Sequence, residues 1–199
     1  MKKLFIVIPL VFLLCFTFAF QDKEAMVQQD NKEILMDIDG NSYKVIRIGD
    51  QFWMAENLRA TKDRDGTLIQ SYCFEDEQSN CEKLGHLYTW DVALKISPDG
   101  WHIPSNEEWN TLIDYLGGES EAGQKLLEGG SSGFNAILAG AADFHGNYLY
   151  LGEYAIFWSS TEANQERAYH QGFRKDGHCD LFAAMKGARI SIRLIKDRK

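Results

Sequence analysis

The sequence lacks a basic surface. Among its 199 residues, 21 lysines and arginines are outnumbered by 29 aspartates and glutamates, which gives a formal net charge of −8 at pH 7. The densest basic segment, from Arg189 to Lys199, is better explained as the outward side of a final strand. Because nucleic-acid binding requires a concentrated positive face, we expect no nucleic-acid partner.

Internal repeats and low-complexity tracts are also missing. Hydrophobic residues make up 45% of the chain and aromatic residues 13%, which is enough to build a real core in a chain of this length. The composition therefore predicts one well-buried domain of ordinary size, with disorder confined to the ends.

Long apolar runs are absent except at the N-terminus. There Lys2 and Lys3 precede an apolar run that extends to Phe20, the arrangement typical of a secretory signal. We expect a signal peptide at residues 1–19, a flexible spacer at 20–32 and one folded domain at 33–199, in a protein that is secreted or held at the cell envelope. Two alternatives remain open: a lipid anchor on Cys15, and an uncleaved signal that spans the membrane.

The distribution of apolar residues predicts an α+β fold. Two β-rich runs flank the turn signal Asp39-Gly40-Asn41, which favours a hairpin. Strands are expected at residues 34–37, 43–48, 51–55, 168–174, 178–184 and 188–195. Helices are expected at residues 87–96, 106–116 and 119–127. Since the helices cluster between two groups of strands, the sheet should be antiparallel and the chain should end as a meander.

The clearest helix signal is a capping box at Ser105. Its hydroxyl can accept from the amide of Glu108, whose carboxylate can reach back to the amide of Ser105. The apolar residues that follow have helical spacing and would share one buried stripe: Trp109, Leu112, Ile113 and Leu116.

Five blocks of this sequence, in this order, carry a family resemblance. They are residues 37–43, 52–58, 100–105 with Glu108-Trp109, 132–136 and 157–161. From Asp37 to Asp197 the chain resembles the Fibrobacter succinogenes major paralogous domain, a family of exported bacterial domains. That family is in turn distantly similar to the formylglycine-generating-enzyme and C-type-lectin-like folds. The resemblance implies a single α+β domain of that type, with an antiparallel sheet and two to three short helices.

The cysteines predict one disulfide. Export makes disulfides favourable, and a bond between Cys73 and Cys81 would close a short polar loop and remove chain entropy worth about 2.5 kcal/mol. In many members of the resembled family a second cysteine pair occupies the positions of Ser97 and Leu194, so this chain does without that bridge. Cys179 is then left over, as a half-buried thiol or as a reactive or intermolecular one.

Candidate metal and catalytic groups are weak in this sequence. His170, His178 and Cys179 have zinc-ligand chemistry, but a two-residue turn at Asp176-Gly177 would place His170 and His178 on opposite faces of the sheet. The oxygen-rich segment 37–41 resembles the start of a calcium loop but lacks its later glutamate, so a turn is favoured and calcium stays only an option. We expect no cofactor.

Carboxylate pairs for glycoside hydrolysis could be nominated, yet nothing in the sequence fixes their separation. The paired late cysteines with which formylglycine-generating enzymes bind copper are absent. The sequence therefore predicts a protein that is not an enzyme, although a divergent enzyme on that scaffold is the alternative.

An aromatic segment near residue 150 is the best candidate contact surface. Tyr148, Tyr150 and Tyr154 present flat apolar faces with polar edges, which suit stacking on sugars or anchoring a protein. The competing interpretation makes Tyr148 and Tyr150 the outward face of an ordinary strand, with Leu149 and Leu151 pointing inward. We expect an exported, non-catalytic binding or structural module at the bacterial cell surface, with a glycan or another surface protein as ligand.

Overall fold

The computed structural model describes residues 33–198. Residues 33–199 form one compact unit that holds two hydrophobic cores and the disulfide bond, so this segment contains what it needs to fold by itself. The predicted signal peptide (1–19), the predicted spacer (20–32) and Cys15 lie outside the described residues. No helix within 33–198 has the length and apolar character needed to cross a membrane.

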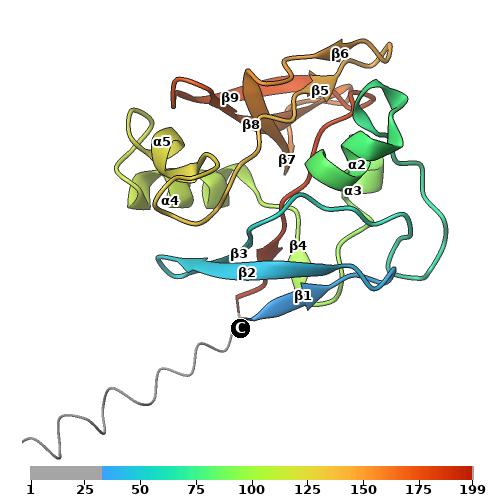
Figure 1. Cartoon of the computed structure of the whole chain (residues 1–199), viewed down its shortest axis with the longest axis horizontal. Coiled ribbons are helices and arrows are strands. Elements are labelled where there is room, and N and C mark those ends of the chain that lie inside the picture. The colour runs from blue at the N-terminus through green and yellow to red at the C-terminus, as the bar shows by residue number, and fades with distance from the viewer. Residues whose placement is uncertain (1–32, 199) are drawn as a thin grey trace, which may run out of the picture. The chain divides into compact units, whose positions relative to one another are not determined.

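The structure is α+β with antiparallel sheets and short helices, as predicted (Figure 1). The largest sheet has five strands in the order β1-β2-β3-β10-β4. Their bounds are β1 (Ile34–Met36), β2 (Ser42–Ile48), β3 (Gln51–Met54), β4 (Trp101–His102) and β10 (Ile195–Lys196). The hairpin predicted at Asp39-Gly40-Asn41 is confirmed, because Met36 pairs with Ser42 across it.

Two further sheets lie apart from the first in Figure 1. A three-stranded meander consists of β7 (Tyr154–Glu162), β8 (Arg167–Arg174) and β9 (Cys179–Met185), in that order. A small hairpin joins β5 (Ala141–Ala142) to β6 (Tyr148–Leu149). The strands predicted at 168–174 and 178–184 are confirmed, while β7 was not predicted.

The prediction that residues 188–195 form the last strand of the meander is wrong. After Gly187 the chain leaves that sheet and runs through the interior, with single bridges from Ile190 to Tyr88 and from Ser191 to Phe157. Nearly every residue from 188 to 195 is buried, so this segment connects two sheets instead of extending one. It becomes regular only at β10, which pairs with β3 and β4.

The helices are short. They are η1 (Phe74–Asp76), a 3-10 turn, and α2 (Gln78–Leu84), α3 (Trp90–Ala93), α4 (Asn106–Tyr115) and α5 (Ala122–Leu126). The helix predicted at 87–96 is reduced to α3, because Leu87 and Tyr88 are used in strand bridges. The helix predicted at 119–127 is reduced to α5, and α2 was not predicted.

The capping box of α4 is confirmed. The amide of Glu108 donates to the Ser105 hydroxyl at 3.2 Å, and the amide of Ser105 donates to the Glu108 carboxylate at 2.8 Å. Trp109, Leu112 and Ile113 are buried, as the spacing predicted. The same Glu108 carboxylate contacts a ring nitrogen of His102 at 2.9 Å, which ties the start of α4 to β4.

Two hydrophobic cores lie on opposite faces of the strands. On β2 and β3, Val45 belongs to the first core and Trp53 to the second, and on β7 the neighbours Ile156 and Phe157 are divided in the same way. Because neighbouring side chains of a strand point to opposite faces, both of the larger sheets pass between the two cores. The second core is dominated by a ring cluster of Trp53, Trp109, Phe134, Phe157 and Phe173.

Arg193 is fully buried beside this ring cluster. Its guanidinium donates to the backbone carbonyls of Met54, Phe134 and Asn135 and to the side-chain oxygen of Asn57, at distances from 2.6 to 3.1 Å. Burial lowers the pKa of Arg193 to about 9, so the group is still charged at neutral pH. Four neutral oxygens thus satisfy a buried cation that joins the end of the chain to two earlier segments, 54–57 and 134–135.

Four hairpin turns in the described residues share one design. They are the segments 37–41, 63–67, 143–147 and 174–178. In each, the fourth residue is a glycine with positive φ whose amide donates to the carbonyl of the first, and the first amide donates to the carbonyl of the fifth. This geometry is a three-residue loop with a bulged glycine, a common hairpin closure.

Candidate functional site

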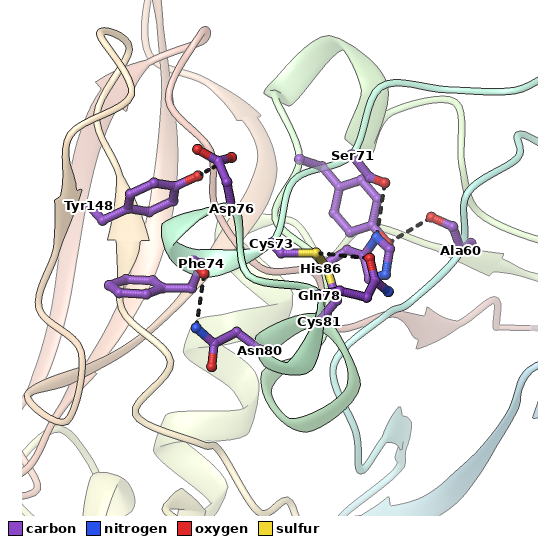
Figure 2. Close-up of a disulfide and its surroundings, with 11 residues drawn as sticks. Ala60, Ser71, Cys73, Phe74, Asp76, Gln78, Asn80, Cys81, His86 and Tyr148 are labelled. Carbon is purple, nitrogen blue, oxygen red and sulfur yellow. Dashed lines mark hydrogen bonds between the residues drawn. A yellow bond between two sulfur atoms is a disulfide. The ribbon is translucent and has the colours of Figure 1, made fainter.

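Tyr148 is a structural residue. Its hydroxyl donates to the carboxylate of Asp76 at 2.7 Å, and its ring lies 4.9 Å from that of Phe74, as Figure 2 shows. These contacts attach the β5–β6 hairpin to η1. Tyr148 is therefore occupied by its own chain, and its ring does not join those of Tyr150 and Tyr154.

The segment to which Tyr148 binds is closed by the predicted disulfide. Cys73 and Cys81 are bonded, and the side-chain amide of Asn80 donates to the carbonyl of Phe74 inside the loop (Figure 2). Glu75 and Asp76 both have positive φ, a conformation that costs energy for residues other than glycine. The bond and the Tyr148 contact hold this strained turn in place.

The interpretation of Tyr148 and Tyr150 as one outward strand face is wrong. The strand β6 ends at Leu149, and Tyr150 turns out of it with a φ of 66°. Leu149 and Leu151, which were expected to point inward, are 40% and 47% exposed. The turn at Tyr150 redirects its ring away from Tyr148 and toward Tyr154, 5.4 Å away between ring centroids.

Tyr150 and Tyr154 line a hollow on one face of the meander. We call it the aromatic pocket, and its walls are Tyr150, Tyr154, Ile156, His170, Gly172 and Phe182. Its volume is about 220 Å³. Drug-sized ligands occupy cavities of roughly 300–1,000 Å³, so this hollow suits a single ring of a larger ligand.

The strand register explains why these residues meet. Ile156 pairs with Gly172, and His170 pairs with Phe182, so the side chains of Ile156, His170 and Phe182 point to the same face of three adjacent strands, with Gly172 among them. At the centre Gly172 has no side chain, which leaves the hollow above it. A methyl group there would lie 3.6 Å from the Tyr154 ring, an ordinary contact, so the space is open and accessible to substitution.

His170 supplies the polar group at the base of the pocket. Its Nδ1 atom is buried and has no hydrogen-bond partner within residues 33–198. Burial lowers the pKa of His170 to about 4, so the imidazole is neutral at physiological pH. It is held between the rings of Trp158 and Phe182, at 6.4 and 6.2 Å. A neutral ring nitrogen without a partner can still donate or accept one hydrogen bond, depending on its tautomer.

The pocket tyrosines also differ from the structural ones in their hydroxyl groups. Tyr43, Tyr88 and Tyr148 each donate to an acceptor of the chain. The hydroxyls of Tyr150 and Tyr154 make no hydrogen bond within the described part of the chain. Two phenols and one imidazole therefore present unused polar groups around an apolar hollow.

Charged groups stand beside the pocket. The guanidinium of Arg174 lies 5.8 Å from the centre of the Tyr154 ring. On β9, Asp180 pairs with Gly172 of the pocket floor, and its carboxylate lies 3.3 Å from the Nε2 atom of His178. The pocket thus combines an aromatic wall with a polar edge.

The register of the β8–β9 hairpin differs from the predicted one. Phe173, and not Arg174, pairs with Cys179, because the turn holds Lys175, Asp176 and Gly177 instead of two residues. His170 and His178 consequently share a face, and Cys179 points to the other, which reverses the predicted arrangement. Residues 33–198 contain no group of three or more His, Cys, Asp or Glu side chains placed to hold a metal ion.

The oxygens of the segment 37–41 are already engaged. The Asp37 carboxylate accepts from Asn41 and from the Tyr43 hydroxyl, and one carboxylate oxygen of Asp39 accepts from the amides of Thr61 and Lys62. The favoured interpretation of this segment as a turn is confirmed, and its carboxylates hold the chain together.

Cys179 is a buried thiol in the second core, 5% exposed. Burial raises its pKa to about 11, which makes it a poor nucleophile at neutral pH. Ser97 and Leu194, the positions that correspond to the missing cysteine pair, are buried as well.

Sequence reasoning found Tyr150 and Tyr154 but missed their partners in the pocket. His170, Gly172 and Phe182 lie on β8 and β9, and Ile156 lies on the unpredicted β7. The signal that could have found His170, Gly172 and Phe182 is the alternation of the strands, once the hairpin register was set by a three-residue loop.

Comparison with known families agrees with the five sequence blocks. The model of a family described as the Fibrobacter succinogenes major domain matches residues 46–196, which is more than half of the chain. No curated protein and no solved structure matches.

Proposed function

The chain belongs to the Fibrobacter succinogenes major domain family, and we propose that it is an exported, non-catalytic binding module whose aromatic pocket takes one ring of a cell-surface glycan. The observation that carries the proposal is the pocket itself, in which rings, a neutral imidazole and unpaired phenols converge on a hollow of about 220 Å³.

The chemistry of the walls favours a sugar ring. One face of a pyranose is lined with C–H groups that stack on aromatic rings, while its hydroxyls need donors and acceptors at the rim. Tyr150, Tyr154 and Phe182 supply the rings, and the Nδ1 atom of His170 supplies the buried polar contact. A flat apolar surface without such polar groups would instead favour a protein ligand.

The location and the finer fold are part of the proposal. The charged and then apolar N-terminal segment is the basis for export, and the bond between Cys73 and Cys81 suits an oxidising compartment. We assign the domain to the C-type-lectin-like type, related to the formylglycine-generating-enzyme scaffold, on the basis of the helix opened by residues 104–109 and the arginine-rich end of the chain.

A binding screen with residues 33–199 on immobilised glycans and polysaccharides tests the proposal. We expect saturable binding by the wild-type domain and at least a 10-fold loss of affinity in Tyr150→Ala and Tyr154→Ala. Gly172→Val, which fills the hollow, should have the same effect without removing a ring.

Tyr115→Ala is the matched control, because Tyr115 is 66% exposed and lies at the end of α4, outside the pocket. It should bind like the wild type. Absence of glycan binding by a folded domain would overturn the proposal, and so would binding that survives Gly172→Val.

A further inference from the structure

The outer edge of β9 has no partner strand. In the meander, β8 pairs on one side with β7 and on the other with β9, and nothing in residues 33–198 pairs with the far side of β9. β9 is seven residues long, and it lies at the margin of its sheet in Figure 1. An unpaired edge of this length is a template for another strand.

The pattern of hydrogen bonds between β8 and β9 shows which backbone amides and carbonyls of β9 point away from the sheet. At one end of the hairpin the backbone amide of Arg174 donates to the carbonyl of His178, and at the other the backbone amide of Lys186 donates to the carbonyl of Glu166. Between these ends, even-numbered residues of β9 therefore exchange bonds with β8. The amides and carbonyls of the odd-numbered residues, Leu181 and Ala183 at the centre, point away from the sheet.

This edge also lacks the usual protection. Exposed edge strands normally carry lysines, prolines or bulges that prevent pairing. β9 contains one charged residue, Asp180, and its central residues Leu181 and Phe182 are 40% and 55% exposed. Its pairing with β8 shows no break in register.

We propose that β9 pairs antiparallel with β9 of a second copy of this chain, about a twofold axis at Phe182. In that register Leu181 of each copy faces Ala183 of the other, so the outward amides and carbonyls of both satisfy one another. The result is one continuous six-stranded sheet.

The charges along β9 fit a second copy in this register. Asp180, the one charged residue of β9, faces Ala184 of the other copy and therefore meets no like charge. Asp180 also lies diagonal to Lys186 of the other copy, a separation over which opposite charges still attract. The strand therefore complements itself.

The twofold axis places both aromatic pockets on the same face of the joined sheet, with the two Phe182 side chains between them. Under the proposed function, this arrangement gives a bivalent glycan-binding surface and raises the apparent affinity for repeating polysaccharides. The dimer itself does not depend on that function.

Cysteine cross-linking of residues 33–199 tests the register. In the proposed register Phe182 of one copy lies opposite Phe182 of the other, at a position of the ladder without hydrogen bonds. Cα atoms of such a pair lie about 4.5 Å apart. A disulfide accepts Cα separations of about 4.4–6.8 Å. Under mild oxidation Phe182→Cys should form a reducible dimer. Ala184→Cys is the matched control: it lies on the same strand and face but opposite Asp180, so it should form no disulfide-linked dimer.

Sedimentation over a concentration series provides the second measurement. The wild-type domain should reach twice the monomer mass, and Ala183→Pro should abolish this, because it removes an outward amide that the fold does not use. Equal cross-linking of Phe182→Cys and Ala184→Cys, or a wild-type domain that stays monomeric, would overturn the proposal. Should Ala183→Pro fail to fold, the cross-linking decides.

Discussion

The two faces of the β7–β8–β9 sheet carry similar residues in opposite states. On one face Phe157 and Phe173 are completely buried, and α4 and α5 pack against them. On the other face Tyr154 is partly exposed and Phe182 is 55% exposed, and they border the aromatic pocket. We call these the closed face and the open face.

The difference between the faces is a matter of coverage, not of composition. On the closed face Phe157 meets three other rings at about 6 Å and is completely buried. On the open face Gly172 takes the place of a side chain, and a hollow remains beside Tyr154 and Phe182. Phe157 and Phe173 on the closed face therefore contribute to stability, while Tyr154 and Phe182 at the open end of the other face are available for binding; Trp158, farther along that face, is buried in the first core.

The largest effect should come from Arg193, whose guanidinium binds four oxygens beside the closed face. Arg193→Met keeps much of the volume but leaves these buried acceptors without donors, at about 1–3 kcal/mol each. We expect a loss of more than about 4 kcal/mol, enough to unfold a domain of ordinary stability. Urea unfolding followed by tryptophan fluorescence measures it.

Arg189→Met is the control for that substitution. Arg189 lies on the same terminal segment and stacks on Tyr72 at 3.8 Å, but it remains partly exposed. It should lose less than about 1 kcal/mol. Similar losses for the two variants would show that stacking, and not the buried hydrogen bonds, makes Arg193 important.

A pair of truncations compares the two faces directly. Phe157→Ala on the closed face opens a cavity in the ring cluster and should cost about 3–5 kcal/mol. Phe182→Ala on the open face should cost less than about 1 kcal/mol while weakening glycan binding. Thermal unfolding at low protein concentration, where any dimer is dissociated, gives both values. Equal losses would contradict the division into a closed and an open face.

His170 makes the open face sensitive to acid. Its pKa of about 4 in the folded state lies below the unfolded value of about 6.5, so above pH 6.5 the residue contributes no pH dependence. As the pH falls from 6.5 to 4, the unfolded state binds a proton that the folded state refuses, and stability decreases by on the order of 2 kcal/mol.

The variant His170→Leu should lose that acid sensitivity. The difference in unfolding free energy between wild type and variant, measured from pH 8 to pH 4, isolates His170 from other groups. His102, whose pKa is raised by its hydrogen bond to Glu108, has the opposite dependence, since its contribution is present at low pH and lost as the pH rises through its folded pKa. A difference that does not change with pH would show that His170 is not desolvated in the pocket.

Local signals in the sequence were sufficient for some elements. The capping box at Ser105, the hairpin at Asp39-Gly40-Asn41 and the bond between Cys73 and Cys81 each depend on residues close together in the chain. Their energetics are nearly independent of what packs around them. These parts of the fold were therefore predictable.

Segments buried on both sides were not predictable in the same way. β7 runs from Tyr154 to Glu162 with an almost continuous buried stretch, so it shows no alternation of polar and apolar residues. The segment 188–194 is also buried on both sides. In the sequence its Arg193 looks like an exposed residue of an edge strand, whereas it is buried. Without alternation, sequence alone does not show which core each side chain enters.

Predicting the aromatic pocket from the sequence depended on the length of one turn, the loop between β8 and β9. The predicted two-residue loop at Asp176-Gly177 shifts the register by one residue, and such a shift moves every side chain of β9 to the other face. Four turns in this domain share a glycine at the fourth position, and that repetition was the available sign of a three-residue loop.

The smallest effect on stability, and the most direct measure of coverage, comes from thiol labelling. Cys179 lies on the closed face with a pKa raised by burial to about 11, so it should react with iodoacetamide only when the domain opens. At low protein concentration, where any dimer is dissociated, a cysteine introduced on the open face by Phe182→Cys should react at least about 100-fold faster at neutral pH. Mild urea should accelerate labelling of Cys179 alone, since the open face is already accessible. Equal labelling rates for the two cysteines in native buffer would mean that the domain often opens at the closed face. Burial in the static structure would then not describe how accessible that face is.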